Sequence, residues 1–247
     1  MSYSDLIINR SDAVNATTTR FSGAPWFQEV KNTDIMVAGV GGIGSWLVFM
    51  LSRINPHSLT IIDNDVVSMS NMAGQMFSLN DIGDPKVVKM ENIVKRYSNY
   101  YRVDCYREQL TENTSVKPVL MCGFDNMAAR KEAYQNWKST LQFHQNKDNF
   151  LLIDGRLSAE MMQVFCITGN DDYYMKEYED KWLFDDSEAE STVCSYKQTS
   201  YCANMIASLM TNLFVNWCTN RCCPLIDRPL PFKTEYLADQ MLFTTEV

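Results

Sequence analysis

The sequence is poor in histidine and lacks the paired cysteines of common metal sites. Its two histidines, His57 and His144, have no serine- or cysteine-based motif near them, which argues against a histidine-assisted hydrolase. Eight cysteines are present, but none of them forms a C-x-x-C pair. The sequence therefore does not predict a four-cysteine zinc site.

An excess of basic residues is also missing. The chain carries 22 Lys and Arg against 30 Asp and Glu, which gives a formal net charge of −8. A protein that grips nucleic acid through its phosphates needs a basic face, so we expect no nucleic-acid partner. The acidic balance is compatible with ATP, because backbone N–H groups, a few cations and Mg²⁺ can hold its phosphates.

Long apolar runs are absent as well. No stretch of eighteen apolar residues occurs, so we expect no membrane span, and the segment 205–218 predicts a buried helix instead. Residues 1–20 are polar and lack the apolar region of a signal peptide. From these absences we expect a cytoplasmic protein whose cysteines are mostly reduced.

What the chain does contain is enough apolar material, 46% of 247 residues, for one good-sized core. A polar arm over residues 1–33 precedes a main domain over 34–247, in which an acidic, aromatic segment at 170–193 predicts a crossing loop. Apolar runs predict strands at 34–38, 59–62, 101–106, 118–122, 149–153 and 162–168 and helices at 45–54, 84–98, 127–143 and 199–219. Residues 224–247 read as an extended tail. The alternation predicts an α/β, Rossmann-like, doubly wound fold with a mostly parallel sheet.

A glycine-rich turn follows the first predicted strand and contains Gly39, Gly41, Gly42 and Gly44, while Asp63 ends the next strand. Glycines let the backbone approach phosphates closely, and the helix N-terminus after them favours an anion. An acid at the end of the second strand would accept hydrogen bonds from ribose hydroxyls. This arrangement predicts a nucleotide site but does not separate NAD from ATP.

Three further segments separate those two ligands. Residues 61–75 read IIDNDVVSMSNMAGQ, residues 81–87 read DIGDPKV, and residues 123–130 read GFDNMAAR. Together with the glycine turn, and in this order, they resemble the ThiF/MoeB superfamily of ubiquitin-activating-type enzymes. The corresponding family segments run V-S-x-S-N-L-x-R-Q, I-G-x-x-K-[AV] and D-N-x-x-x-R. The resemblance covers residues 36–130 closely and becomes looser beyond residue 150.

The resemblance implies a reaction and a fold detail. These enzymes transfer AMP from ATP to the C-terminal carboxylate of a ubiquitin-like or sulfur-carrier protein, with Mg²⁺ as cofactor. A carrier ending in Gly is the implied partner, and the last strands of the sheet are expected to be antiparallel. Two anions meet in this reaction, so the site needs cations and positioning more than an acid–base pair.

The same resemblance assigns site residues. Lys86 would neutralise charge on the phosphates, and Asp125 would hold Mg²⁺. Arg130 would orient the loop that carries Asp125. The other nucleotide-site residues implied by these motifs are Asp65, Ser70, Asn71, Gln75 and Asn126. Each assignment has a plainer alternative: a solvated surface charge for Lys86 and Arg130, and a helix N-cap for Asp125 with Asn126.

One position departs from the family pattern. Gly74 stands where the family has an arginine that contacts the triphosphate, and losing such a cation can cost on the order of 3 kcal/mol of transition-state stabilisation. Arg10 and Arg20 are the candidate replacements, and Arg20 is the better placed. In the family an arginine from this region reaches the partner subunit's site, so the resemblance implies a homodimer. The alternative is a catalytically degenerate protein that binds nucleotide or a partner.

Residues 192–199 read TVCSYKQT and resemble the catalytic segment of activating enzymes. Cys194 would attack the acyl-adenylate to form a thioester, or would take part in sulfur transfer. The alternative is that Cys194 is a small buried residue at the head of the last helix. The predicted activity is thus ATP-dependent adenylation of a carrier's C-terminal carboxylate. The rivals are adenylation of a peptide or another small substrate, activation of a tRNA base, which the acidic charge opposes, and NAD-dependent oxidoreduction.

Overall fold

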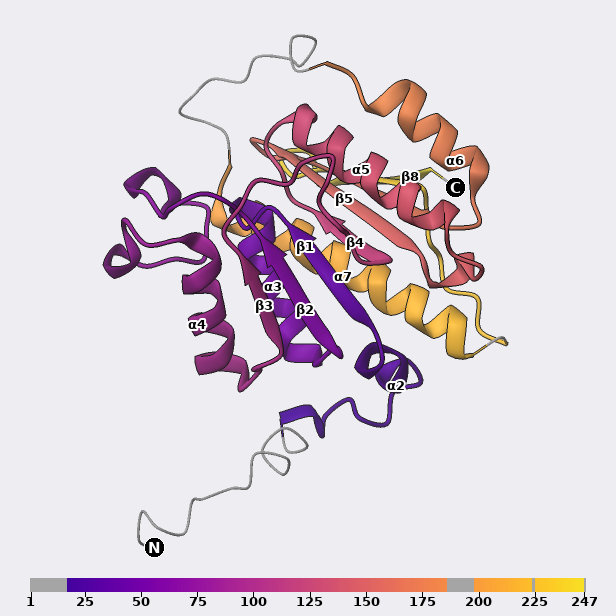
Figure 1. Cartoon of the computed structure of the whole chain (residues 1–247), viewed down its shortest axis with the longest axis horizontal. Helices are drawn as coiled ribbons and strands as arrows, with labels where there is room; N and C mark the ends of the chain where they lie inside the picture. The colour runs from indigo at the N-terminus through magenta and orange to yellow at the C-terminus, as the bar shows by residue number, and fades with distance from the viewer. Residues whose placement is uncertain (1–16, 186–197, 224, 247) are drawn as a thin grey trace, which may run out of the picture.

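The computed structural model describes residues 17–185, 198–223 and 225–246, which are built around one eight-stranded sheet (Figure 1). The strand order is β3-β2-β1-β4-β5-β6-β7-β8, with neighbours from β3 to β5 parallel and those from β5 to β8 antiparallel. This confirms the predicted fold class, including the antiparallel extension. The strands are β1 (Asp34–Ala38), β2 (Ser58–Ile62), β3 (Val103–Tyr106), β4 (Val119–Cys122), β5 (Leu151–Ser158), β6 (Met161–Thr168), β7 (Lys233–Leu237) and β8 (Leu242–Glu246).

Helices cover both faces of the sheet. One face carries α3 (Gly42–Ile54), α4 (Lys86–Ser98) and α7 (Ser200–Cys222), and the other carries α5 (Met127–Gln142), α6 (Asp172–Glu177) and the π-helical turn η5 (Tyr178–Trp182). The short helix α2 (Phe27–Lys31) precedes β1. Three single turns complete the described elements: η2 (Met69–Asn71), η3 (Leu79–Asp81) and η4 (Lys147–Asn149). No helix in the described parts of the chain is long and apolar enough to cross a bilayer.

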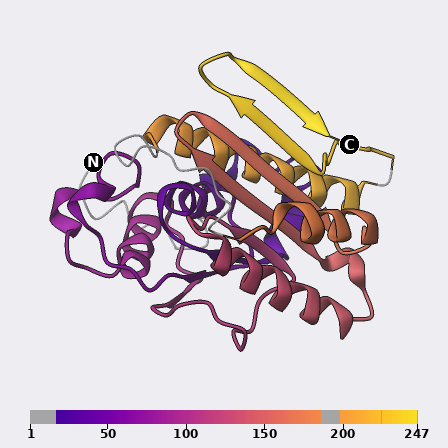
Figure 2. The ribbon, with the colours of Figure 1, turned by 90° about the horizontal axis from the view of Figure 1, so that it is seen from above.

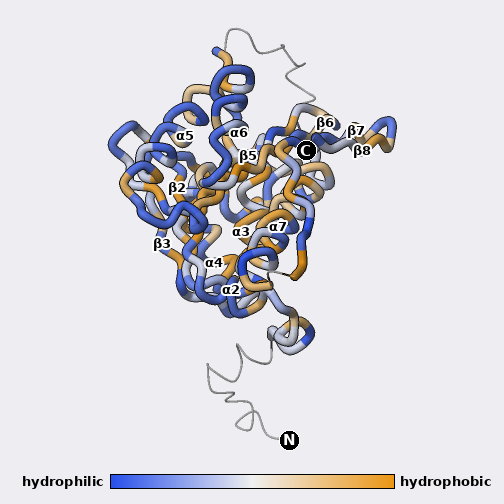
Figure 3. The backbone as a smooth tube through the Cα atoms, turned by 90° about the vertical axis from the view of Figure 1, so that its right-hand side faces the viewer, coloured by the Kyte–Doolittle hydropathy of each residue, from blue (hydrophilic) through white to orange (hydrophobic). Residues whose placement is uncertain are grey.

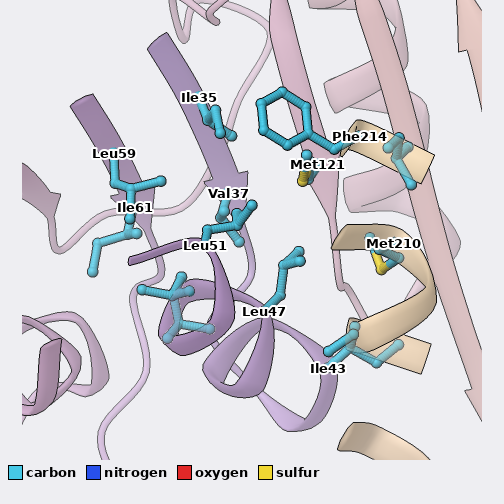
Figure 4. Packing of buried hydrophobic residues seen from close by; sticks show 14 of the residues in the cluster. Ile35, Val37, Ile43, Leu47, Leu51, Leu59, Ile61, Met121, Met210 and Phe214 are labelled. Atoms are coloured by element: carbon cyan, nitrogen blue, oxygen red, sulfur yellow. The ribbon is translucent and has the colours of Figure 1, made fainter. Parts of the chain in front are cut away.

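The core explains why β1 reads as an unbroken apolar run. Ile35 and Val37 pack against the α3 and α7 face, whereas Met36 and Ala38 pack against the α5 face. A strand covered on both sides has no polar face to alternate with. Figure 4 shows Leu47 of α3 lying between the strands and α7.

Two helices begin at residues other than those predicted. Helix α3 begins at Gly42 rather than Ser45, so the last part of the glycine turn is its first turn. Helix α4 begins at Lys86, because Pro85 has an extended backbone with ψ 131°. Asp84 is therefore not its N-cap, and it lies 2.7 Å from the Lys89 ammonium instead.

Residues 172–182 are helical, which corrects the predicted acidic loop for that part of 170–193. Asp171 caps α6 by accepting a hydrogen bond from Tyr174 N at 3.0 Å. The Tyr174 ring stacks on Phe232 with a centroid distance of 4.3 Å, and Tyr178 is fully buried. The partners are remote in sequence, so the segment alone does not show what its aromatic side chains pack against. Residues 186–193 lie outside the described part of the chain.

Two further segments have more strand than predicted. Strand β5 continues through Asp154 and Gly155 to Ser158 because β6 pairs with it along its whole length. The predicted extended tail contains β7 and β8, which form an antiparallel hairpin at the edge of the sheet. The hairpin projects from the rest of the molecule (Figures 2 and 3).

Candidate functional site

The site lies where the strand order reverses, because β1 has both β2 and β4 as neighbours. The carboxyl ends of these three parallel strands meet at one edge, which is where doubly wound folds bind ligands. The glycine turn follows β1, Asp63 follows β2 and Gly123 follows β4. They line a cavity of about 350 Å³, a size within the range of small-molecule sites.

The glycine turn is closely packed. Gly39 has a φ of +84°, a left-handed conformation that favours glycine. A Cβ at Gly44 would lie 1.8 Å from the Gly39 carbonyl oxygen, so no larger residue fits there. Gly123 N donates to Ala38 O at 2.9 Å and closes the turn against β4. The backbone therefore forms the floor of the cavity.

The first turn of α3 has features that favour an anion. Its N-cap is Gly41, which offers no side chain to the helix N–H groups, and its first turn contains no acidic residue. Uncapped N–H groups and the helix dipole together attract a phosphate. Because Gly41 and Gly42 line the cavity, the predicted phosphate contact would lie at this end of α3.

Asp63 holds the turn in place. Its Oδ2 accepts from Val40 N at 2.7 Å, and its Oδ1 accepts from Asp65 N at 2.8 Å. Each carboxylate oxygen has a second acceptor site, so ribose hydroxyls can still bind. The contact with ribose stays a prediction, but the carboxylate is positioned at the cavity for it.

Lys86 is buried in the cavity wall, which excludes the surface-charge alternative. Its side chain is 6% exposed and its ammonium lies 2.7 Å from Asp65 Oδ2, whose side chain is 60% exposed. The backbone creates this pairing, since Lys86 N donates to Asp65 O at 3.1 Å and Val66 bridges to Pro85. The chain thus keeps a charged lysine at the cavity with a solvated partner.

Asp125 and Asn126 follow β4 and have different roles. Asn126 Oδ1 accepts from Ala129 N at 2.8 Å, so Asn126 is the N-cap of α5. Asp125 is exposed in the cavity, and within the described chain no basic side chain forms an ion pair with it. An open carboxylate beside a phosphate subsite fits Mg²⁺, which usually takes one or two protein carboxylates plus phosphate oxygens.

Arg130 lies beneath the Asp125 loop and is buried, which excludes the surface alternative. Its Nη2 donates to the carbonyl oxygens of Phe124 and Gly155, the latter at 3.0 Å. Its Nε lies 3.4 Å from the carboxylate of Asp154. Arg130 therefore ties the residue before Asp125 to β5, in agreement with the predicted orienting role.

A second arginine shares the same buried acid. Asp154 is 1% exposed, and its Oδ2 accepts from Arg156 Nε at 2.8 Å and from the Tyr178 hydroxyl at 2.9 Å. Burial raises the pKa of Tyr178 well above its usual value, so this hydroxyl remains a donor at neutral pH. The network connects η5 to the strand beneath the site.

The three predicted residues of the segment after β2 divide into two groups. Gln75 lines the cavity, and its buried Oε1 has no hydrogen-bond partner among the described residues, which fits a polar ligand. Asn71 Oδ1 instead accepts from Ser68 N at 2.8 Å, and the Ser70 hydroxyl lies 2.9 Å from that of Ser68. Their phosphate contacts stay predictions, since neither residue lines the cavity in this structure.

Of the predicted catalytic residues, Arg20 lies elsewhere. Arg20 precedes α2, which docks on the far end of α7 through an Arg221–Glu29 ion pair of 2.7 Å. That edge is where β1 begins, opposite the cavity (Figure 1). Arg20 therefore does not line the cavity of its own chain. Cys194 lies outside the described residues.

The site also contains residues that sequence reasoning missed. Gln109, Phe124 and Gln198 line the cavity. Phe124 and Gln198 lie within the family-like segments 123–130 and 192–199, but the resemblance assigned no site role to either residue. Gln198 reaches the glycine turn only because its backbone bridges to Ala159 at the end of β5. No local pattern in the sequence signals such a long-range contact.

A second cavity of about 690 Å³ lies beneath residues 108–117 and shares Ile62 and Gln109 with the first. Neither the glycine turn nor the first turn of α3 lines it. The features that favour phosphate therefore belong to the smaller cavity.

The chain is similar in sequence to several known proteins. A stretch of 92 residues, 37% of this chain and 21% of the relative, is 30% identical to tRNA threonylcarbamoyladenosine dehydratase 2 of Saccharomyces cerevisiae. A stretch of 145 residues, 53% of this chain and 34% of the relative, is 27% identical to the NEDD8-activating enzyme E1 catalytic subunit of Caenorhabditis elegans. These matches span about a fifth and a third of the two relatives.

The fold is similar to that of a solved structure of Escherichia coli MccB with ATP. The TM-score is 0.67 at 14% identity, and the match covers 97% of this chain and 71% of MccB. The ThiF family profile matches residues 14–241, which is nearly the whole sequence. The chain belongs to the ThiF family.

Proposed function

We propose that this protein is an ATP-dependent adenylyltransferase that activates the C-terminal carboxylate of a ubiquitin-like or sulfur-carrier protein. One observation supports this most: a buried, charged Lys86 faces the same cavity as an uncapped helix N-terminus and an open Asp125. A cation, backbone donors and a carboxylate at one edge suit a triphosphate with its metal ion.

The nucleotide would lie along the carboxyl ends of the strands. Its phosphates would contact the N–H groups of Gly41 and Gly42, and its ribose hydroxyls would contact Asp63. Lys86 would turn from Asp65 towards the phosphates, because the solvated Asp65 carboxylate can be left to water. Asp125 would hold Mg²⁺, which supplies charge neutralisation on the phosphates when bound.

In the reaction a carboxylate oxygen of the carrier attacks the α-phosphorus of ATP, and the bond to the β-phosphate oxygen breaks. The products are an acyl-adenylate and pyrophosphate. Both reactants are anions, so Lys86 would stabilise the charge that accumulates as they meet. Arg130 would contribute by holding the Asp125 loop against β5.

The carrier, the homodimer and the cytoplasmic location belong to the same proposal. The C. elegans relative acts in NEDD8 activation by its name, which supports a ubiquitin-like carrier for this chain. In a homodimer Arg20 would serve the partner's cavity, since it does not line its own. Cys194 would receive the activated carrier as a thioester.

The decisive measurement is exchange of labelled pyrophosphate into ATP with Mg·ATP and candidate β-grasp carriers ending in Gly. Lys86→Met and Asp125→Asn should each lower exchange by about 100-fold or more, because the first removes a positive charge beside the phosphates and the second removes a carboxylate ligand of Mg²⁺. Lys89→Met is the matched control. Lys89 lies on the same helix but pairs with Asp81 and Asp84 outside the cavity, so exchange should be retained.

ATP binding without exchange across all carriers would contradict the proposal and favour a degenerate, nucleotide-binding protein, the alternative that Gly74 raises. A carrier adduct cleaved by thiols in the wild type and missing in Cys194→Ala would support the thioester step. Adduct formation that survives Cys194→Ala would contradict it.

A second candidate comes from the yeast relative, which is named as a tRNA dehydratase. The same adenylation chemistry would then act on a modified tRNA base. The net charge of −8 opposes this function. Release of pyrophosphate from ATP with tRNA, and not with any carrier, would favour it over the carrier proposal.

A further inference from the structure

Gln198 fills the space between two glycines of the cavity. A Cβ at Gly42 would lie 1.8 Å from Gln198 Oε1, and a Cβ at Gly74 would lie 2.9 Å from Gln198 Cγ. Gly42 is the first residue of α3, and Gly74 is the position at which the family arginine is missing. The glutamine side chain is therefore sandwiched between the phosphate subsite and the site of the lost cation.

The backbone around Gln198 is fixed on both sides. On one side it bridges in parallel to Ala159, at the end of β5. On the other side Thr199 is the N-cap of α7, with its hydroxyl accepting from Cys202 N at 3.5 Å. A sheet edge and a long helix thus position this residue, so it is part of the cavity wall.

Gly74 is held in place as well. Its carbonyl oxygen accepts from Trp46 Nε1 at 3.0 Å, and Met76 N donates to Ser45 Oγ at 3.1 Å. The partner residues in these two bonds, Trp46 and Ser45, both belong to α3. Because the segment cannot swing away, a side chain at Gly74 would enter the volume that Gln198 now occupies.

The Gln198 amide oxygen lies where a phosphate oxygen would lie at the N-terminus of α3. Gln198 Oε1 lies over the first turn of α3, where the partial positive charge of the helix favours an oxygen. A glutamine amide also carries two N–H donors, which a rotation about its last bond can present to an anion. The amide can therefore occupy the subsite when it is empty and donate to a phosphate when one binds.

We propose that Gln198 contacts the phosphate chain of ATP and takes the place of the arginine that is absent at Gly74. This inference rests on the proposed function, because it assumes a triphosphate in the cavity. Two changes are then linked. Gly74 removes the cation from the segment after β2, and Gln198, just before α7, supplies a neutral hydrogen-bond donor in its place. Gln198 thus acts as a phosphate-binding residue, and Gly74 provides the room it needs.

The test is calorimetric titration of the full chain with Mg·ATP and, separately, with adenosine, which has no phosphate. Gln198→Glu has the same shape but places a negative charge beside the phosphates, so its Kd for ATP should rise about tenfold or more. Its Kd for adenosine should match that of the wild type. Gln142→Glu, an exposed change at the end of α5, should alter neither.

Gln198→Ala and Gly74→Arg supply a double-mutant cycle. Each single change should weaken ATP binding, the first by losing a donor and the second by colliding with Gln198. Together they should bind ATP at least as tightly as Gln198→Ala alone, because the arginine then fits and brings a cation. Additive losses in the double variant would overturn the inference.

Other outcomes also decide the question. Unchanged ATP affinity in Gln198→Glu, or tighter ATP binding in Gln198→Ala, would overturn the inference and leave the proposed function standing. A wild-type protein that binds neither ATP nor adenosine would overturn both. ATP binding with the expected Gln198→Glu defect, but no pyrophosphate exchange, would support the inference and contradict the proposed activity.

Discussion

The Lys86 ammonium lies 2.7 Å from a carboxylate oxygen of Asp65, and of these two side chains only that of Lys86 is buried. The pair is therefore half solvated, with the lysine facing the cavity and the aspartate facing water. A buried charge whose partner can be hydrated contributes little to folding. Its value to the protein lies in what the lysine can bind.

Lys86→Met should consequently leave the protein folded. Methionine is similar in length and apolar, and the exposed Asp65 carboxylate needs no replacement partner, so the free energy of unfolding should change by less than about 1 kcal/mol. Urea unfolding followed by circular dichroism measures this. A loss of several kcal/mol in the free energy of unfolding would show that the lysine is structural. Lost pyrophosphate exchange in this variant would then no longer indicate a role in catalysis.

Arg130→Lys should destabilise the protein, although it keeps the charge. Lysine cannot reach the carbonyl oxygens of Phe124 and Gly155 together, because its single ammonium lacks the planar fork of the guanidinium. We expect a loss of about 2–3 kcal/mol in unfolding free energy. The control is Lys131→Gln at the next residue, which breaks only an exposed ion pair with Asp185. It should lower the free energy of unfolding by less than about 1 kcal/mol. Equal effects of the two changes would contradict this reading.

Gly44→Ala should disrupt the glycine turn. The new Cβ would lie 1.8 Å from the Gly39 carbonyl oxygen, a backbone atom that cannot move aside. A loss of more than about 3 kcal/mol, or failure to fold, is expected. Gly23→Ala is the control, because its Cβ would meet nothing within 4 Å. Thermal unfolding of both variants gives the comparison, and a stable Gly44→Ala protein would mean that the turn is looser than described.

The tether between α5 and η5 should weaken in acid. A hydrogen bond from Lys138 holds the pKa of Glu179 below its usual value of 4.5. A carboxyl group with a lowered folded-state pKa stabilises the protein above its unfolded pKa, and that contribution fades as pH falls through the folded value.

Glu179→Gln should thus cost up to about 1 kcal/mol at neutral pH, since the pair is partly exposed, and nothing well below pH 4.5. Unfolding of both proteins in urea between neutral pH and about pH 3 tests the trend. Glu112→Gln, an exposed change, should show no such pH dependence. A difference in unfolding free energy between the wild type and Glu179→Gln that grows as the pH falls would contradict this prediction.

Subunit mixing tests whether Arg20 serves a partner's cavity. Arg20→Ala and Lys86→Met should each be inactive alone, but a dimer of the two contains one cavity with a wild-type lysine and a wild-type Arg20 from its partner. Exchange activity should therefore return on mixing. A mixture of Lys86→Met with Asp125→Asn should stay inactive, because each cavity keeps one defect. No recovery in the first mixture would remove Arg20 from the site.

Local patterns determined much of this protein. The apolar runs of β1 and β4, the glycines between β1 and α3, and the family motifs at Lys86 and Asp125 all act over short stretches of chain. Apolar runs, tight turns and helix ends leave their pattern within a few neighbouring residues, so their positions could be predicted to within a few residues. The position of the cavity at the carboxyl edge of the sheet follows from the same information.

The tertiary structure alone decided the rest. Residues 172–182 form a helix because Tyr174 and Tyr178 find Phe232 and the Asp154 network, partners that lie far along the chain. Gln198 reaches the glycine turn only through pairing with the end of β5. Gly74 read by itself is a missing cation. In the folded chain Gly74 leaves room for the side chain of Gln198. Packing between remote segments decides which residues share a volume, so the sequence alone could not show this contact.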